Sequence, residues 1–389
     1  MEKTIKDLDI YISDGNYSSK YPRSEEFVDE GIPFIRGNNM VDGDITDDEM
    51  YHITPEKHAV LLKGHVKAGD VLITTRGNIG QVAIVPDRHE DSNINAQIVL
   101  LRTNPESLYN RYLLWALQSQ RANEQYLALQ TGTALKQLPV GKLEKLLIKV
   151  ADINKQHEIA DILDKTYGVI KARRNELQLL DDLIKARFVE LFGDPIINSN
   201  SYNVLTLNDV CTKVTDGTHD TPERFEEGVL LLTGKNIRAT GIIFDDIEYV
   251  SEKDHRIIYD RCNPEYGDVL YTNIGVNYGT ACFNNLDYEF SMKNIALLKP
   301  QRDILNGYYL WICLNYMRDY ILAQNQVGGA QTFMGLATIK KITIPVPPIE
   351  IQIQFEKFIK QVDKSKVVVQ KALDKAQLLF DSLMQEYFG

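Results

Sequence analysis

The side chains of this sequence best suited to recognise another molecule lie in loops at similar places in its two halves. Arginine, lysine, asparagine and glutamine present hydrogen-bond donors and acceptors that match the edges of DNA bases. Threonine and tyrosine residues in the same loops are included among the candidates. The candidate DNA-contacting residues are Arg76, Asn78, Thr133, Lys136, Gln137, Lys235, Asn273, Asn277, Tyr278, Gln326, Gln331 and Thr332. Each of them, taken alone, is as typical of an ordinary polar loop as of a base contact.

No motif in the sequence predicts a catalytic or metal site. The segment Asn263-Pro264-Glu265-Tyr266 resembles a motif of adenine methyltransferases, but it lacks the second proline and no glycine-rich cofactor loop precedes it. The segment Gly275-Val276-Asn277-Tyr278-Gly279 lacks the Gly-Lys-Ser/Thr ending of a phosphate loop. The seven histidines contain no HExxH motif or clustered pair, and the four cysteines form no CxxC motif. We therefore expect no catalytic residue, no bound metal and no cofactor held by this chain alone.

Length and composition predict a multidomain soluble protein. The 389 residues suggest two or three domains, and 44% hydrophobic with 25% charged residues is typical of globular chains. No apolar run approaches the roughly 20 residues that cross a bilayer, and the first residues lack the apolar stretch of a signal peptide. Scattered cysteines fit a reducing compartment. We expect a cytoplasmic protein with no membrane partner.

The net charge of −11 argues against a simple basic nucleic-acid binder. Only the surface that faces phosphates must be positive, and one stretch between residues 102 and 149 is locally basic. Its cations are Arg102, Arg111, Arg121, Lys136, Lys142, Lys145 and Lys149. On this signal alone, a solvated helix face explains the stretch better than a DNA-facing surface does.

The sequence contains the same unit of about 195 residues twice. Gly69-Asp70-Val71-Leu72 recurs as Gly267-Asp268-Val269-Leu270, and Tyr112-Leu113-Leu114-Trp115 pairs with Tyr308-Tyr309-Leu310-Trp311. Further pairs are Gly37-Asn38-Asn39 with Gly234-Lys235-Asn236, Gln156 with Gln352, and Phe192-Gly193 with Phe388-Gly389. All these pairs lie 196 to 198 residues apart, which indicates a tandem duplication.

Each copy begins with short β-rich segments and ends in one long helix, so the fold class is α+β. The turn at 76–80 between two β-branched runs predicts a hairpin. In 153–192 and 350–388, apolar residues recur at separations of three, four or seven positions, which predicts a coiled-coil seam. Forty helical residues span about 60 Å. A single amphipathic helix of this length needs a partner, and the duplicate helix is the obvious one.

The repeated motifs resemble those of the specificity (S) subunits of Type I restriction–modification systems. The resemblance covers the whole chain and is carried by 33–39, 69–80, 342–348 and, most specifically, Glu190-Leu191-Phe192-Gly193-Asp194-Pro195. It implies target recognition domains at 1–150 and 196–348, a central conserved helix at 151–195 and a C-terminal conserved helix at 349–389. The two helices are then expected to form an antiparallel coiled coil. The first helix departs from the family pattern, because Val150-Ala151-Asp152 replaces its proline-rich entry.

The resemblance also implies partners. The chain is expected to bind double-stranded DNA at a bipartite, asymmetric site, to dock two methyltransferase subunits and to associate with restriction subunits. S-adenosylmethionine would be bound by the methyltransferase subunits only. The candidate partner-binding residues on the helices are Leu177, Leu180, Ile184, Leu373 and Leu379.

Two other classes of protein remain open. An adenine methyltransferase is the enzymatic alternative, and a coiled-coil scaffold that joins two protein-binding domains is the structural one. The duplicated tryptophans, Trp115 and Trp311, are expected to occupy equivalent buried places in either case.

Overall fold

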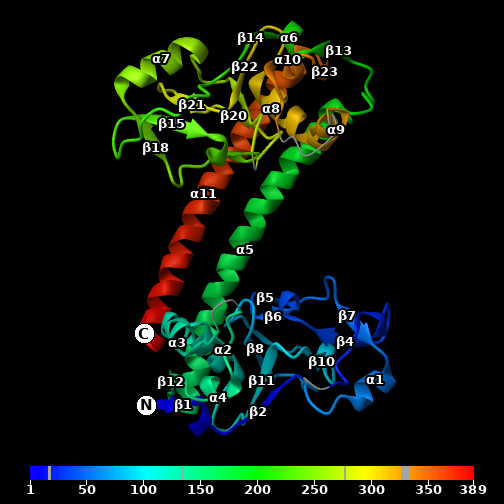
Figure 1. Cartoon of the computed structure of the whole chain (residues 1–389), viewed down its shortest axis with the longest axis vertical. Coiled ribbons are helices and arrows are strands. Elements are labelled where there is room, and N and C mark those ends of the chain that lie inside the picture. Colours follow the sequence, from blue (N-terminus) through cyan, green and yellow to red (C-terminus); the bar gives the residue numbers. More distant parts are fainter. Residues whose placement is uncertain (16–18, 133–134, 276, 326–332) are drawn as a thin grey trace. The chain divides into compact units, whose positions relative to one another are not determined.

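The chain folds into two compact units, shown in a computed structural model (Figure 1). Residues 1–15, 19–132, 135–275, 277–325 and 333–389 are described. Unit 1 contains Met1–Arg174 and Lys371–Gly389, and unit 2 contains Asn175–Gln370. Each unit therefore holds one β-rich head, the start of one long helix and the end of the other.

The head of unit 1 is built on two four-stranded sheets, with strand orders β2-β11-β8-β9 and β10-β4-β7-β3. The first sheet is antiparallel throughout. The strands of the head are β1 (Glu2–Thr4), β2 (Ile10–Asp14), β3 (Phe27–Val28), β4 (Ile32–Ile35), β5 (Met40–Val41), β6 (Asp44–Ile45), β7 (Tyr51–Ile53), β8 (Val71–Thr74), β9 (Val82–Ile84), β10 (Asn93–Ile94), β11 (Ile98–Thr103) and β12 (Leu147–Lys149). Its helices are α1 (Pro55–Val60), α2 (Asn110–Gln118), α3 (Gln120–Leu129) and α4 (Val140–Leu143).

The head of unit 2 repeats this plan with the sheet orders β14-β22-β19-β20 and β18-β15-β21. Its strands are β13 (Asn203–Thr206), β14 (Cys211–Asp216), β15 (Val229–Thr233), β16 (Ile237–Arg238), β17 (Gly241–Ile242), β18 (Glu248–Val250), β19 (Val269–Tyr271), β20 (Ala281–Phe283), β21 (Ser291–Lys293), β22 (Ala296–Pro300) and β23 (Thr343–Val346). Its helices are α6 (Leu207–Val210), α7 (Glu252–Cys262), α8 (Gly307–Tyr316), α9 (Arg318–Gln324) and α10 (Leu336–Ile339). The expected duplication of a β-rich head is confirmed.

The two long helices predicted from the apolar spacing are present as α5 (Ile153–Phe192) and α11 (Ile349–Phe388). In unit 2 the aromatic rings of Phe192 and Phe355 lie 5.3 Å apart, and Asp181 pairs with Lys366. As α5 runs backward from residue 192 to 181, its partner residues on α11 run forward from 355 to 366, so the pair is antiparallel.

The same antiparallel pairing holds within unit 1. The rings of Tyr167 and Phe380 lie 5.6 Å apart, and the Arg174 guanidinium donates to Gln377 at 3.3 Å. Most residues of the predicted seam are buried, including Ile170 and Ile359. The apolar spacing also places Leu379 in the seam, and this is wrong, because its side chain is 54% exposed. The same exposure leaves Leu379 accessible as a candidate partner-binding residue.

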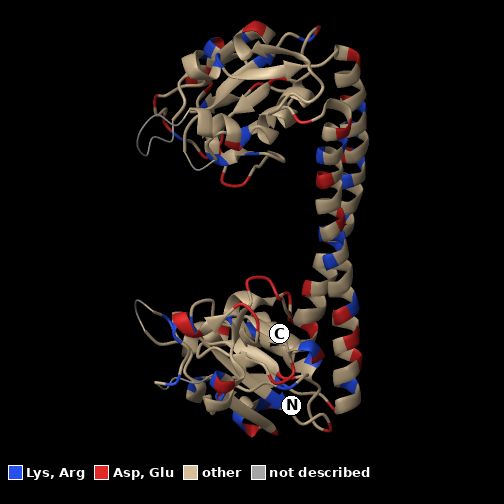
Figure 2. Ribbon diagram, turned by 90° about the vertical axis from the view of Figure 1, so that its right-hand side faces the viewer, with Lys and Arg blue, Asp and Glu red and all other residues tan. Residues whose placement is uncertain are grey.

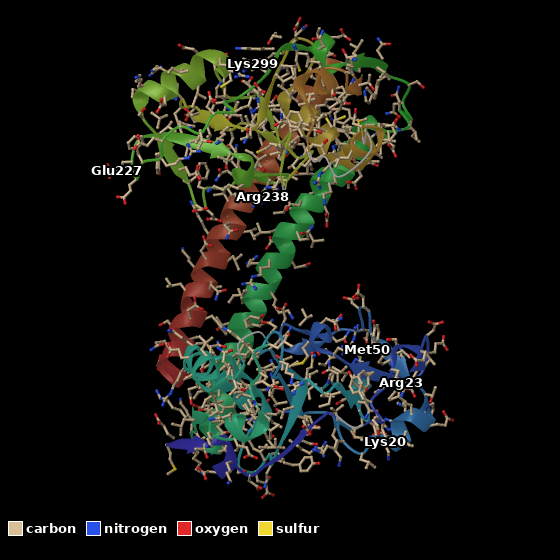
Figure 3. All side chains as sticks on the ribbon, in the orientation of Figure 1. Lys20, Arg23, Met50, Glu227, Arg238 and Lys299 are labelled. Atoms are coloured by element: carbon tan, nitrogen blue, oxygen red, sulfur yellow. The ribbon has the colours of Figure 1, made fainter. Side chains whose placement is uncertain are left out.

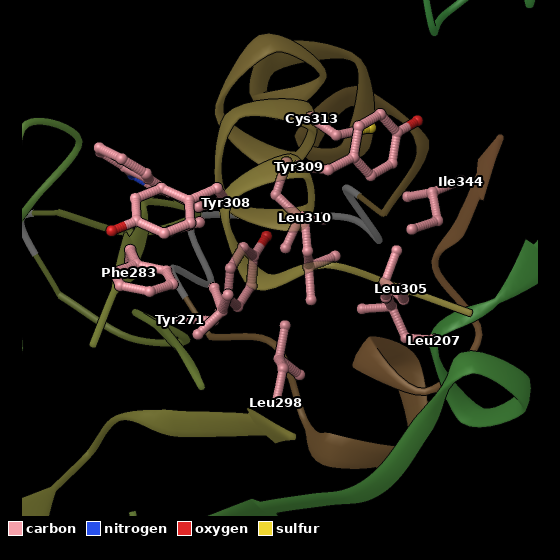
Figure 4. Packing of buried hydrophobic residues seen from close by; sticks show 14 of the residues in the cluster. Leu207, Tyr271, Phe283, Leu298, Leu305, Tyr308, Tyr309, Leu310, Cys313 and Ile344 are labelled. Carbon is pink, nitrogen blue, oxygen red and sulfur yellow. The ribbon is translucent and has the colours of Figure 1, made fainter. Parts of the chain in front are cut away.

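The core of unit 2 joins its head to both helices. Residues from β19, β22 and α8, among them Tyr271, Leu298 and Tyr309, form one buried cluster (Figure 4). Phe192, at the end of α5, enters this cluster with its ring 4.8 Å from that of Tyr309. In unit 1 the corresponding contact is made by Phe388, whose ring lies 5.1 Å from Tyr112.

Buried polar side chains repeat between the units and hold each head on its helix. Gln156 Oε1 accepts from the backbone N–H of Tyr109 at 2.9 Å, and Gln352 Oε1 accepts from that of Asn306 at 2.8 Å. Both amides donate to two backbone carbonyls as well. Because a buried amide without partners is costly, these glutamines fix where each long helix starts relative to its head.

The two tryptophans are both buried, but they do not occupy equivalent places. Tyr112 donates its hydroxyl to the carbonyl of Lys149, and Tyr309 donates its hydroxyl to that of Pro345. This equivalence of Tyr112 with Tyr309 places Trp115 opposite Ile312, one residue beyond Trp311. Their indole nitrogens accordingly bond to different groups, Asp164 on α5 and the carbonyl of Ala239. The sequence pairing of the tryptophans was therefore wrong by one residue.

The repeated Gly-Asp-Val-Leu motif places a buried carboxylate in each head, and each carboxylate has a cation. Arg102 bonds Asp70 at 2.7 and 2.8 Å. Lys299, labelled in Figure 3, lies 2.7 Å from Asp268, which is 2% exposed. Burial raises the pKa of Asp268 despite the opposing effect of Lys299.

We expect Lys299→Met to destabilise unit 2 by about 3–5 kcal/mol at pH 7, because it leaves a buried carboxylate without its cation. A raised carboxyl pKa in the folded state favours the protonated form there. The destabilisation should therefore shrink as the pH falls toward that raised pKa and grow again above it. Urea unfolding at pH 5 and pH 7 measures both effects, with exposed Lys253→Met as the control. An equal loss at both pH values would contradict this assignment.

We also expect Phe388→Ala to destabilise unit 1 by about 3–5 kcal/mol, although the residue is next to last in the chain. Its side chain is 2% exposed and packs on Tyr112. Urea unfolding followed by Trp115 fluorescence in a Trp311→Phe background reports on unit 1. The control is Leu378→Ala, because Leu378 is 73% exposed and should cost less than 1 kcal/mol. Equal effects of the two changes would show that the end of α11 does not complete unit 1.

Candidate nucleic-acid interface

The predicted hairpin in unit 1 connects β8 to β9, and its turn is held by Thr74. The Thr74 hydroxyl donates to the carbonyl of Asn78, and the backbone N–H of Gln81 donates to the Thr74 hydroxyl at 3.0 Å. Gly80 has φ +88, and a Cβ atom there would lie 2.7 Å from the ring of Tyr126. The turn therefore needs glycine at this position for both its backbone angle and its contact with α3.

The second candidate loop of unit 1 lies directly against this turn. The backbone N–H of Leu138 donates to the carbonyl of Thr75 at 2.8 Å, and Arg76 pairs with Gln137 in an isolated β-bridge. Thr131 and Gln137 exchange backbone hydrogen bonds of 2.8 and 2.9 Å. The structure thus brings together two loops that are some sixty residues apart in the sequence. We call the described residues 75–81 and 130–132 with 135–138 the tip surface of unit 1.

Unit 2 repeats this arrangement. Thr272 donates its hydroxyl to the carbonyl of Asn277, and the N–H of Met334 donates to the carbonyl of Asn273 at 2.8 Å. Ile274 and Phe333 form an isolated β-bridge, as Arg76 and Gln137 do in unit 1. We call the described residues 272–275, 277–280 and 333–335 the tip surface of unit 2. The two tip surfaces have the same backbone plan and different side chains.

Within unit 1 the structure brings the described candidate residues together. Arg76, Asn78 and Lys136 are exposed and Gln137 is half-buried, all on the tip surface. Thr133 lies outside the described residues, as do Gln326, Gln331 and Thr332 in unit 2.

Within unit 2 the described candidates are buried, packed or paired inside the head. Asn273 is only 1% exposed, so its side chain does not lie on the surface. The Asn277 amide donates to the carbonyl of Gly234 at 2.8 Å. Tyr278 is half-buried against the core, and Lys235 pairs with Asp246 and Glu248 at 2.9 and 3.1 Å. Asn277 thus stabilises the loop, and Lys235 has its charge offset by two carboxylates.

Two exposed apolar residues also lie on the tip surfaces, and they are not among the polar candidates predicted from the sequence. Leu135 is 88% exposed in unit 1, and Phe333 is 50% exposed in unit 2. Apolar side chains contact the methyl group of thymine in the major groove. The sequence signal that could have identified Leu135 and Phe333 is a large apolar residue within an otherwise polar, glycine-containing loop.

Three of the seven cations in the basic stretch between residues 102 and 149 are paired with carboxylates, whereas Lys136, Lys142 and Lys145 are exposed. Arg102, Arg111 and Arg121 pair with Asp70, Asp164 and Glu2 at 2.7, 2.6 and 2.9 Å. These carboxylates are distant in sequence, so the local count of charges did not reveal them. Figure 2 shows positive and negative residues interspersed over the described parts of both heads. These three arginines are partly buried ion-pair partners within unit 1, so they form neither a solvated helix face nor a DNA-facing surface.

The methyltransferase-like motif has a structural explanation. Asn263 ends α7 in the left-handed conformation, with φ 41. Its side-chain oxygen accepts from Lys213 at 3.1 Å, and its carbonyl accepts from Lys299 at 2.9 Å. Both groups of Asn263 are engaged in closing a loop, which is a common role for asparagine at the end of a helix.

The candidate partner-binding leucines differ in exposure. Ile184 is 3% exposed and lies in the core cluster of unit 2, with Leu180 packed against that cluster. Leu177 and Leu373 are half-buried on the helices. Larger exposed apolar side chains lie beside them: Leu179 and Leu183 on α5, 59% and 46% exposed, and Leu378 on α11. Within the described residues, no helix is both long enough and apolar enough to span a membrane.

The fold defines a protein with two related β-rich heads, each carrying the same pair of bonded loops with different side chains. A family model described as the type I restriction modification DNA specificity domain matches residues 3–179 and again 200–376. The chain belongs to this family, with two copies of the domain in tandem.

Known proteins of this kind resemble the chain over nearly its whole length. It is 23% identical over 378 residues to a putative type I restriction enzyme MjaX specificity subunit from Methanocaldococcus jannaschii, covering 89% of this chain and 85% of that protein. The crystal structure of a Type-I restriction-modification system S subunit from M. genitalium matches with a TM-score of 0.62 at 18% identity, covering 100% of this chain and 96% of the other. A chain from a structural study of type I R-M complex assembly matches with a TM-score of 0.52 at 17% identity, covering 100% and 97%. These likenesses support the specificity-subunit interpretation over the methyltransferase and scaffold alternatives.

Proposed function

We propose that each head reads one half of a bipartite, asymmetric DNA site through its tip surface. The observation that carries this proposal is that both heads present the same pair of bonded loops with different side chains. Arg76 and Lys136 supply donors in unit 1, whereas the bridged pair in unit 2 is Ile274 and Phe333. Since bases differ in both hydrogen-bonding groups and the thymine methyl, different side chains select different sequences.

We assign two DNA-reading domains, 1–150 and 196–348, and two helical segments, 151–195 and 349–389. Each range contains one head or one long helix. The chain itself carries out no catalysis in this proposal. Methyl transfer belongs to two methyltransferase subunits that bind S-adenosylmethionine, and cleavage belongs to restriction subunits. Exposed leucines such as Leu179 and Leu183 on α5 provide an apolar face for docking the methyltransferase subunits.

The pairing of cations in the heads with carboxylates supports the proposal that binding to DNA phosphates depends on the partner subunits. Phosphate contacts provide most of the non-specific affinity of DNA-binding proteins, and three arginines of unit 1 are already paired with carboxylates. We expect the methyltransferase subunits to supply much of the phosphate contact.

Selection from a random DNA library by the complex of this chain with its methyltransferase subunits tests the proposal. Enrichment of a defined sequence is the expected result, and a coiled-coil scaffold would enrich none. Calorimetric titration of the isolated chain with S-adenosylmethionine tests the enzymatic alternative. Heat of binding at one site per chain would contradict the assignment of this cofactor to the partners.

A further inference from the structure

Two histidines and an aspartate converge in the head of unit 1, away from the tip surface. His58 lies on α1, His65 follows this helix, and their ring centroids are 4.4 Å apart. One ligand atom of each of His58, His65 and Asp91 lies within 4.8 Å of the other two. No clustered pair is expected from the spacing of the histidines in the sequence, and this expectation was wrong, because the loop after α1 folds back on the helix.

Hydrogen bonds fix which nitrogen of each ring faces the aspartate. His58 Nδ1 donates to Asn93 Oδ1 at 2.5 Å, and His65 Nε2 donates to the carbonyl of Leu61 at 2.6 Å. A neutral imidazole has one donor and one acceptor nitrogen. In neutral rings with these hydrogen bonds, the remaining nitrogens, His58 Nε2 and His65 Nδ1, present lone pairs. They lie 3.4 and 3.6 Å from the two carboxylate oxygens of Asp91.

This arrangement places three electron-pair donors around one point with no donor hydrogen between them. Asp91 is held there by its backbone, which has φ 62 and donates from its N–H to the carbonyl of Val66 at 2.9 Å. Acceptors that face one another repel unless a positive charge lies between them.

The equivalent place in unit 2 contains its own cation. There His255 Nε2 lies 3.3 Å from Glu289, and Arg256 Nη1 lies 2.9 Å from the same carboxylate oxygen. His255 and Glu289 stand 197 and 198 residues after His58 and Asp91, and the residue that corresponds to Arg256 in unit 1 is Ala59.

The residue that corresponds to His65 in unit 2 is Cys262. Its thiol donates to the carbonyl of Ile258, four residues earlier, as His65 donates to that of Leu61. Unit 2 therefore keeps the local hydrogen bond but has an arginine in place of a second imidazole nitrogen. Unit 1 has the extra imidazole and lacks the arginine, so the cation that Arg256 supplies in unit 2 has no side-chain counterpart among the described residues at this place in unit 1.

We propose that His58 Nε2, His65 Nδ1 and an oxygen of Asp91 bind a divalent transition metal, with Zn²⁺ as the best fit. Zinc bonds of about 2.0–2.2 Å in tetrahedral geometry separate neighbouring ligand atoms by about 3.3–3.6 Å. Each imidazole nitrogen lies at about this separation from a different Asp91 oxygen, at 3.4 and 3.6 Å, and one ligand atom of each residue lies within 4.8 Å of the other two, so a small movement of the exposed carboxylate completes the set. Two imidazole nitrogens favour zinc over calcium or magnesium, which prefer oxygen.

The surroundings of the three ligands suit this role. Asn93 and Leu61 orient the rings, as outer partners of metal-bound histidines do. The Asp91 side chain is 71% exposed, which leaves the fourth coordination position to water. The metal would join α1 and its following loop to the turn at Asp91, so it acts as a structural clamp in one head only.

Titration of the chelator-treated full chain with Zn²⁺, followed by calorimetry, tests this site. One equivalent per chain is the expected result, and Co²⁺ should give the visible absorption of a four-coordinate ion. His65→Gln and Asp91→Asn should each weaken Zn²⁺ binding at least tenfold. At free Zn²⁺ a hundred times Kd, the melting temperature of unit 1 should rise by about 5 °C in the unaltered chain.

The matched control is Glu289→Gln, which changes the corresponding carboxylate of unit 2 and should leave Zn²⁺ uptake unchanged. Circular dichroism establishes that the variants are folded. Asp91→Asn alone decides the question if His65→Gln is unfolded, because the Asp91 side chain is largely exposed. Absence of stoichiometric uptake, or uptake that both unit 1 variants retain, would overturn the proposal and leave protons as the charge between the three groups.

Discussion

Replacing both Leu179 and Leu183 by Asp is expected to abolish assembly of this chain with its methyltransferase subunits. These residues are four apart on α5, so they lie on one face of the helix, and they are 59% and 46% exposed. Burying unpaired carboxylates in an apolar interface costs several kcal/mol, and about 2.7 kcal/mol already lowers affinity a hundredfold. Size-exclusion chromatography of the mixed subunits measures the loss.

The exposed positions make this a cleaner experiment than the leucines chosen from the sequence. Leu180 packs against the core cluster of unit 2, so Leu177→Asp with Leu180→Asp would disturb folding as well as docking. The Leu179/Leu183 variant should keep the unfolding midpoint of the original chain. Glu176→Gln, also on α5, serves as a control for changed charge. A complex that forms normally with both aspartates present would show that this face of α5 is not the dock.

Replacing Arg76, Lys136 and Gln137 by Ala is expected to relax one half of the recognised DNA site and leave the other half unchanged. The three residues share the tip surface of unit 1, where Arg76 and Gln137 form a β-bridge. Each lost base contact should cost about 1–3 kcal/mol of discrimination, which is about 5- to 150-fold. Methylation of DNA libraries with each half-site randomised in turn measures the effect.

Two comparisons interpret this result. Lys142→Ala removes an exposed lysine of the same head outside the tip surface, and should leave both half-sites as stringent as before. Phe333→Ala should relax only the half-site read by unit 2. If the triple change weakens all sequences uniformly, its residues contact phosphates rather than bases. If it relaxes both halves equally, the heads do not read separately.

The sequence was sufficient to predict the duplicated α+β heads and the two long helices, because both depend on local patterns. The apolar spacing that predicts α5 and α11 is periodic over forty residues. The hairpin at 76–80 is marked by glycines whose positive φ angles the turn requires. Such signals lie within one segment of chain, so no knowledge of distant contacts is needed.

What the sequence did not predict depends on contacts between distant segments. Trp115 and Trp311 align when the two sequence copies are matched by residue type. The hydrogen bonds of the Tyr112 and Tyr309 hydroxyls show instead that these two tyrosines are equivalent, so the structural alignment of the helices is shifted by one residue. The partners of the apparently free arginines are carboxylates far away in sequence, as Asp164 is for Arg111. Local charge and letter matching cannot reveal either arrangement.

The candidate site shows the same division between local and distant information. Asn273 is a suitable base-reading residue by type, yet the fold buries it. His58 and His65 become neighbours only because the loop after α1 turns back. The sequence placed the candidate residues in loops, and the described parts of these loops lie side by side in each head. The exposure of each side chain required the three-dimensional structure.

The measurement that tests two-headed DNA reading most directly is methylome sequencing of a host that carries this chain with its methyltransferase subunits. The expected result is one methylated motif made of two different blocks of specified bases, separated by a spacer of fixed length and unspecified sequence. A single continuous motif, or two identical blocks, would contradict reading by two different heads, and no methylated motif would contradict a role in sequence-specific modification.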